Sequence, residues 1–383
     1  MLPEIKNLYV NWIDGMKINK NLFIETDLAN IDSIRDAVSL GLNDFSYGLL
    51  PSEKGNESLS LDLIDTRANS FKLKINLCRA VTNGGCRIEI LKSSSELSIT
   101  QDIKDMDGGK GAKSLVFDLV LTVNPYERKP YGQPHAEESP LRYPFTTSDY
   151  KIQIVPSDQL SNYDVGNFSL TLGRIVLKGD EYIFDSKYIP PCTSINSHAS
   201  LITYYRKLGS SLNTIEENCT KIIQKIVSKG QSTALANNVK ILCEKILYYI
   251  SDIFFQYRML ALQKPPIYLI DFFIRMANQV RVLNDCYAEK EKEEMLSYFT
   301  EWTELTAGNF DNMLNDLVFH DYDHRNINNS MQKVENFVLL IDNLMNKLSS
   351  LDLIGKRKER DIFVREKSNA AKPETKKGWS LLE

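Results

Sequence analysis

Hydrophobic and polar residues alternate in short runs along the first half of the chain, as in strands that bury one face. These runs are rich in β-branched and aromatic residues and lie at 58–64, 71–81, 86–91, 115–123 and 150–155. One helix is predicted at 29–42, where Ile31, Ile34, Val38 and Leu42 recur at helical spacing. Residues 1–190 are therefore predicted to form an antiparallel β-sandwich.

Two loops are predicted to interrupt the strands. The first, at 105–114, reads DMDGGKGAKS, and the second, at 124–149, contains five prolines. Proline has no N–H to donate and disfavours ladder pairing, so the second segment is predicted to be an irregular, exposed loop. Loops on a rigid scaffold often bind partners, which makes this one a candidate contact.

The pattern changes at Pro190-Pro191, after which apolar residues follow helical spacing. Helices are predicted from about Ser197 to Gly230, from 232 to 262, from Pro266 onward, and finally around 331–348. We therefore expect a helical bundle at 191–352 and an α+β multidomain protein overall. A flexible basic tail is predicted at 353–383.

The first long helix carries an unbroken heptad stripe. Its residues are Leu201, Tyr205, Leu208, Leu212, Ile215, Cys219, Ile222 and Ile226. Two arrangements fit this spacing: an antiparallel bundle within one chain, or a seam at which several copies of the chain meet. The second predicts an oligomer that a charge at Ile215 or Ile222 would dissociate. Its interface would consist of Leu201, Tyr205, Leu208, Leu212, Ile215, Ile222 and Ile226.

Composition and charge narrow the possible functions. A length of 383 residues favours two or three domains. A net charge of −4 argues against a dedicated nucleic-acid binder. No secretory signal and no apolar run long enough to span a membrane is present, so a cytoplasmic protein is expected. Six scattered cysteines, without a CxxC pair, predict reduced thiols, several of them in the core.

Candidate chemistry is sparse. The glycine-rich segment at 107–114 departs from the phosphate-loop pattern and precedes a predicted strand, where a phosphate loop would open a helix. His320 and His324 lie about one helical turn apart with carboxylates between them, a spacing that a metal could use. No catalytic glutamate accompanies them, so a solvated turn is the favoured interpretation. We predict neither an enzyme nor a cofactor, with a metal-dependent enzyme as the least favoured alternative.

Three motifs, in order along the chain, resemble the TssK family of type VI secretion baseplate proteins. The N-terminal segment matches the family pattern at Trp12, Gly15, Met16 and Phe23, with Asp14 in place of a glutamate. Pro190 and Pro191 lie in an Ile-Pro-Pro-Cys linker that precedes the long helix. The third, weaker match is Pro266 with Tyr268-Leu269.

The resemblance implies a cytoplasmic bacterial homotrimer at the inner face of the envelope. Its β-sandwich shoulders would bind the wedge proteins TssF and TssG, and its helical neck would join three chains. The family's C-terminal head, which reaches the membrane complex, has no evident counterpart here, so a headless variant with an unknown envelope-docking component is expected. A phage-tail-like baseplate or receptor-binding adaptor remains the alternative.

Overall fold

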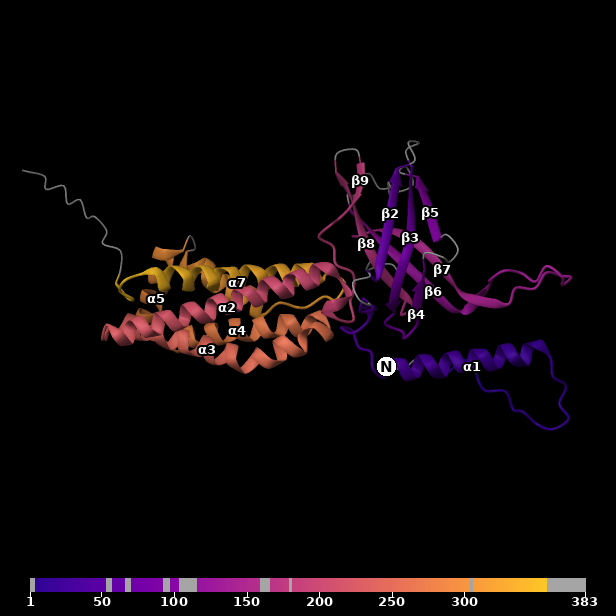
Figure 1. The fold of residues 1–383 in the computed structure, drawn as a ribbon, viewed down its shortest axis with the longest axis horizontal. Helices are drawn as coiled ribbons and strands as arrows, with labels where there is room; N and C mark the ends of the chain where they lie inside the picture. Colours follow the sequence, from indigo (N-terminus) through magenta and orange to yellow (C-terminus); the bar gives the residue numbers. More distant parts are fainter. Residues whose placement is uncertain are drawn as a thin grey trace, which may run out of the picture.

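The computed structural model describes residues 4–52, 57–65, 70–91, 97–102, 116–158, 166–178, 181–303 and 306–356. It confirms an α+β protein, with a strand-rich first half and a helical second half placed end to end in an elongated molecule (Figure 1). The predicted glycine-rich loop at 105–114 lies outside the described residues.

The strands form two antiparallel sheets. In the first, β3 (Ser70–Val81) pairs with β1 (Gly48–Leu49), β2 (Leu59–Asp65), β4 (Arg87–Ile90) and β5 (Leu97–Asp102). The second has the order β7-β6-β8-β9, built from β6 (Val116–Tyr131), β7 (Phe145–Pro156), β8 (Ser169–Lys178) and β9 (Glu181–Phe184). The five predicted runs fall on β2, β3, β4, β6 and β7.

Alternate residues of the two sheets share one buried apolar layer. Leu73 of β3 and Leu119 of β6 are fully buried in it, and the rings of Phe71 and Phe117 both contact Tyr182 of β9. The period-2 pattern of the sequence therefore places one face of each sheet in a common core.

The predicted irregular loop at 124–149 is wrong. Strands β6 and β7 continue past the sheet as a two-stranded arm, pairing from Arg128 with Ser148 to Tyr131 with Phe145 (Figure 1). The register shifts between Asn124 and Arg128, next to Pro125, and Pro130 lies opposite Thr146. In a two-stranded ribbon each strand has one open edge, where a proline removes no ladder hydrogen bond.

The first helix, α1 (Lys20–Ser39), begins nine residues before the predicted start at residue 29. The side chain of Asn19 caps it by accepting from the N–H groups of Asn21 and Leu22. Its buried residues are Ala29, Asp32 and Arg35, whereas Ile34 is 64% exposed. The apolar stripe that predicted the helix is therefore not buried against the sheets, although Ile31 and Ile34 line a small cavity together with Arg87 and Val123.

The second half contains α2 (Ala199–Ser228), α3 (Ala234–Met259), α4 (Pro266–Cys286), α5 (Glu289–Trp302), α6 (Ala307–Val318) and α7 (Ile327–Ser350). The predicted helices correspond to α2, α3, α4 and α7. Helix α2 packs against α7 and α3, and α4 packs against α3, α6 and α7. Gly230, with a φ of +58°, follows the end of α2 as predicted.

Beyond α7 the described chain stays packed against the helices. Ile354 is buried, its N–H donates to the side chain of Gln231, and the N–H of Gly355 donates to the hydroxyl of Tyr298. The first residues of the predicted tail are therefore part of the folded body, and 357–383 lie outside the described residues. Five cysteines are buried free thiols, while Cys286 is exposed.

Candidate interaction sites

The predicted heptad seam lies inside the single chain. Leu201, Leu208, Leu212, Ile215, Cys219, Ile222 and Ile226 are all buried, and Tyr205 is half-buried with its ring stacked on Tyr257 of α3. The helices that cover α2 belong to the same chain. Packing against helices of the same chain therefore accounts for the heptad spacing, and these side chains are largely inaccessible on the surface of the single chain.

The linker at Pro190-Pro191 is built into the fold. The N–H of Leu49 donates to the carbonyl of Pro191 at 2.8 Å, and the N–H of Thr193 donates to the carbonyl of Leu49 at 3.0 Å. Residues Ile189 and Cys192 are buried within a core that continues from the sheets into the helices. The two halves are therefore held at a fixed relative position by a paired, buried segment.

Gly48 allows this close approach. Its φ is +115°, and a Cβ at this position would lie 2.0 Å from the carbonyl oxygen of Pro191. Both the backbone conformation and the space therefore require glycine. The Leu49 to Pro191 pairing depends on it.

His324 is a second link between the halves. Its Nε2 donates to the carbonyl of Tyr47 at 2.9 Å, and its Nδ1 accepts from the hydroxyl of Tyr322 at 2.7 Å. The side chain is 4% exposed, and burial lowers its pKa to about 4. The imidazole is therefore neutral at pH 7. The segment is a turn with exposed carboxylates at Asp321 and Asp323, as predicted, but His324 is buried and not solvated.

The two histidines do not converge on a metal site. His320 pairs through Nε2 with Ser330 at 2.7 Å, and its Nδ1 lies 3.2 Å from the amine of Lys333. Both ring nitrogens of each histidine are thus engaged by protein groups, and no group of three metal-ligating side chains occurs among the described residues. The arrangement supports structural roles for both side chains.

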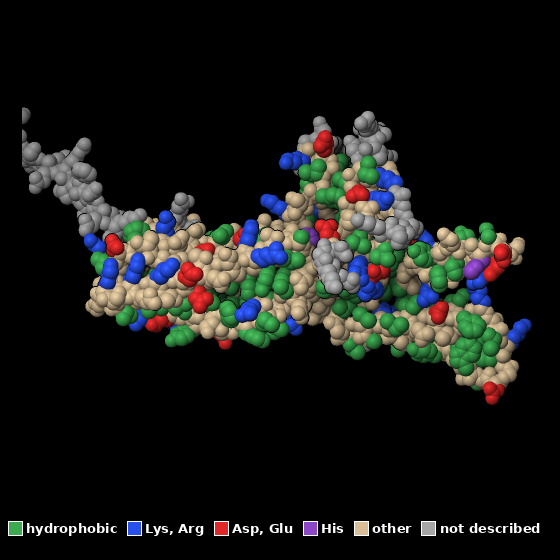
Figure 2. Space-filling view, viewed as in Figure 1, with side chains coloured by type: hydrophobic (Ala, Val, Ile, Leu, Met, Phe, Trp, Pro, Cys, Tyr) green, Lys and Arg blue, Asp and Glu red, His purple; other side chains and the backbone are tan. Residues whose placement is uncertain are grey.

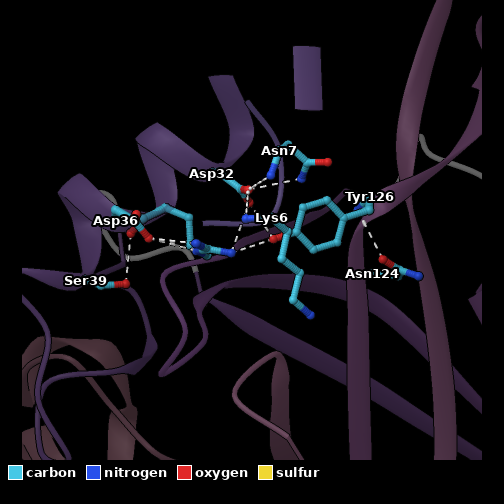
Figure 3. A network of polar contacts seen from close by, with 8 residues as sticks. Lys6, Asn7, Asp32, Asp36, Ser39, Asn124 and Tyr126 are labelled. Atoms are coloured by element: carbon cyan, nitrogen blue, oxygen red, sulfur yellow. Dashed lines mark hydrogen bonds and ion pairs between the residues drawn. The ribbon is translucent and has the colours of Figure 1, made fainter. Parts of the chain in front are cut away.

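A buried polar network attaches α1 and the N-terminal segment to the sheets (Figure 3). Asp32 accepts hydrogen bonds from the hydroxyl of Tyr126 at 2.7 Å and from the main chain and side chain of Asn7 at 3.0 Å. Arg35, which is also buried, pairs with Asp32 at 3.0 Å and with Asp36 at 2.7 Å. One carboxylate therefore joins three separate segments of the chain.

The network also shifts the titration of its members. Burial alone would raise the pKa of Asp32, but the hydrogen bonds from Tyr126 and Asn7 lower it overall. Burial and the bond to Asp32 raise the pKa of Tyr126 to about 12. At pH 7 the network therefore consists of a carboxylate, a guanidinium and a neutral phenol. No sequence motif marks it, because its members are far apart along the chain.

The N-terminal segment and α1 form an arm that carries exposed apolar side chains. The segment runs antiparallel to the helix. The hydroxyl of Tyr9 is hydrogen-bonded to that of Ser33, and the rings of Trp12 and Phe23 lie 6.1 Å apart between centroids. Trp12 and Phe23 are 47% and 58% exposed. Figure 2 shows a dense hydrophobic patch at the outer end of this arm. Two of the family-motif residues thus meet on an exposed surface.

A second apolar surface lies on the outside of the helical half. Tyr248, Phe255 and Met259 of α3 are spaced by seven and four residues, so they share one helix face, and all three are more than half exposed. Figure 2 shows hydrophobic side chains exposed along the lower edge, where Figure 1 draws α3. An exposed apolar row of this kind is typical of a contact with another protein.

The chain is thus an elongated α+β protein, with a strand-rich body, two projecting arms and a helical body joined to it end to end. The particular fold is that of TssK. A crystal structure of TssK is similar with a TM-score of 0.52 and 14% identity over 89% of this chain and 70% of that chain.

Two assemblies also contain similar chains. One is the baseplate complex of the type VI secretion system, with a TM-score of 0.49, 11% identity, and coverage of 89% of this chain and 99% of that chain. The other is the TssK–TssF–TssG baseplate subcomplex, with a TM-score of 0.48, 12% identity, and coverage of 89% of this chain and 100% of that chain. No protein-family model and no curated protein matches the sequence. None of the helices described has the length and apolar character needed to cross a membrane.

Proposed function

We propose that the chain is a TssK-like structural component of a type VI secretion baseplate. It would act as a homotrimeric adaptor between the wedge proteins TssF and TssG and the envelope-docking machinery. The observation that carries the proposal is the likeness to the TssK crystal structure, which covers 89% of the chain and thus both halves. The motif residues support it, since Trp12 meets Phe23 on the exposed arm and Pro191 pairs with Leu49 at the junction.

Each part of the chain has a role in this proposal. Residues 1–190 would be the β-sandwich shoulder, 191–352 the helical neck and 353–383 a tail. The buried linker and His324 hold shoulder and neck at a fixed geometry, which an adaptor needs in order to place its partners at set distances. The two arms, at 4–39 and 124–149, are the proposed contacts for TssF and TssG.

Self-association would use the exposed α3 row of Tyr248, Phe255 and Met259. The buried α2 stripe cannot serve, because its residues already pack against α3 and α7. Burying three large apolar side chains at an interface between copies would contribute about 1.5–3 kcal/mol each. A trimer held by this row would dissociate without unfolding its subunits.

The test is co-purification of the full chain with TssF and TssG from the same gene cluster. A complex that contains all three proteins is expected. Replacing Leu141, Tyr143 and Phe145 on the β6–β7 arm by serine should reduce the amount of TssF and TssG that co-purifies, while the same change at Leu339, an exposed residue of α7, should not. Failure of the unmodified chain to bind either protein would overturn the proposal.

A further inference from the structure

A groove lies between α2 and α3 on the surface of the helical half. It has a volume of about 600 Å³ and an apolar lining that includes Leu212, Ile250, Ile253 and Phe254. Tyr205 and Leu212 of the heptad seam form part of its lining, whereas the residues of the junction between the halves do not. Its shape and chemistry therefore call for a separate explanation.

The floor of the groove is rigid. Gly209 has no side chain, so the ring of Tyr257 lies against α2, with its nearest atom 3.2 Å from where a Cβ would be. Tyr205 stacks on that ring at 4.9 Å, and the Tyr257 hydroxyl donates to the carbonyl of Tyr205 at 2.6 Å. An apolar side chain would thus enter a preformed site and order little of the protein on binding.

The rim of the groove is positively charged. Arg206 of α2 and Arg258 of α3 line it and are exposed. Among the described residues, no carboxylate forms an ion pair with either guanidinium. The groove therefore fits a short apolar segment that ends in, or is flanked by, an acidic residue.

We propose that the groove binds the C-terminal segment Trp379-Ser380-Leu381-Leu382-Glu383 of the same chain. Three large apolar side chains would fill the lining, and the carboxylate of Glu383 would pair with Arg206 or Arg258. Tethering favours this occupant over free partners, because a linked segment is present at high effective concentration.

The reach of the chain agrees with this assignment. Gly355 packs beside Ala236 at the start of α3, and Phe254 lies 18 residues further along that helix, about 27 Å away at 1.5 Å per residue. The 24 steps from Gly355 to Trp379 can span up to about 80 Å. The other apolar cluster beyond residue 356, at 362–364, would reach the groove only if the chain were almost fully extended, because the eight steps from Gly355 to Phe363 span at most about 29 Å.

Photo-crosslinking in the full chain tests the proposal. A benzophenone side chain introduced at position 379 should crosslink to peptides of α2 or α3 that contain groove residues, whereas the same group at position 363 should do so with a much lower yield. Phe254→Asp should lower the yield from position 379 by about fivefold, while Val227→Asp, an exposed apolar position of α2 outside the groove, should leave it unchanged.

The charge pair is tested by exchange. Arg258→Glu combined with Arg206→Glu should reduce the crosslink about fivefold, and adding Glu383→Lys should restore it. Absence of groove crosslinks from position 379 would overturn the proposal, as would crosslinks that join an isotopically labelled chain to an unlabelled one. The readout involves neither TssF nor TssG, so it is independent of the proposed baseplate role.

Discussion

His324 Nε2 donates to the carbonyl of Tyr47 at 2.9 Å, joining residues that are 277 positions apart. The ring of Tyr47 also contacts the imidazole edge to face, with 4.9 Å between centroids. Replacing His324 by leucine leaves the Tyr47 carbonyl and the Tyr322 hydroxyl without their partner. Each buried unsatisfied group costs about 1–3 kcal/mol. We expect a clear loss of stability in urea unfolding, and His135→Leu, at an exposed histidine, should change it little.

The unfolding free energy of the protein should fall as the pH is lowered from about 6.5 to about 4. Burial lowers the folded pKa of His324 to about 4, from an ordinary value of 6.5, so the unfolded chain binds more protons between these values. Stability contributed by the neutral imidazole is complete above about pH 6.5 and is lost as the pH falls towards 4. The unfolding free energy lost through His324 over this pH range totals about 3 kcal/mol.

Burial also lowers the pKa values of His198 and His320, so they act in the same direction. Unfolding free energies measured from pH 7 to pH 4.5 should therefore show a slope that His324→Leu reduces without abolishing. An unchanged slope in that variant would contradict the assignment of a buried neutral imidazole.

A charge in the α2 stripe should unfold the helical half. Ile215 is fully buried between helices of one chain, so Ile215→Asp places a carboxylate in the core at a cost of more than about 4 kcal/mol. Circular dichroism of this variant should show a reduced helical signal and no cooperative unfolding transition of the helices. Phe255→Asp, on the exposed α3 row, should keep the unfolding transition and lower only the mass measured by light scattering. A folded Ile215→Asp monomer would contradict this distinction.

Gly48→Ala should weaken the junction between the halves. The new Cβ would lie 2.0 Å from the Pro191 carbonyl at a φ of +115°, so the Leu49 to Pro191 pairing has to open. Hydrogen exchange at the amide of Leu49 should rise together with a global loss of roughly 3 kcal/mol or more. Gly230→Ala is the matched control. Its φ is also positive, but no atom lies within 4 Å of the new Cβ, so the unfolding free energy should fall by only about 1 kcal/mol.

Asp32→Asn should release the N-terminal arm. The variant loses the carboxylate that accepts from Tyr126 and Asn7 and leaves buried Arg35 with Asp36 as its only remaining carboxylate among the described residues. We expect faster proteolysis within residues 4–19 and a local cost of about 2–3 kcal/mol. Asp27→Asn, at an exposed pair with Arg128, should leave cleavage unchanged. Equal cleavage rates in the two variants would rule out the anchoring role of Asp32.

Several strands and helices followed from the sequence because their signals are local. Strand β3 and the helices α2, α3, α4 and α7 show an unbroken period of two or of helical spacing, and Gly230 ends its helix as expected. Strands β5 and β8 were missed, since β5 is largely polar and Gly173-Arg174 interrupts the alternation of β8. The prolines of β6 led to the wrong prediction of an irregular loop, because only the strand pairing shows that this part of β6 lies in a two-stranded ribbon with open edges.

The sequence by itself determined the α+β class, the change of period near Pro190-Pro191 and which helix faces are apolar, since these depend on spacing along one segment. It could not determine what covers each face. Only the tertiary structure buries the α2 stripe inside one chain and leaves Ile34 and Val38 of α1 exposed, while Asp32 and Arg35 are buried beside Tyr126. Burial and long-range hydrogen bonds, such as that from His324 to Tyr47, depend on which distant segments meet, and spacing carries no information about that.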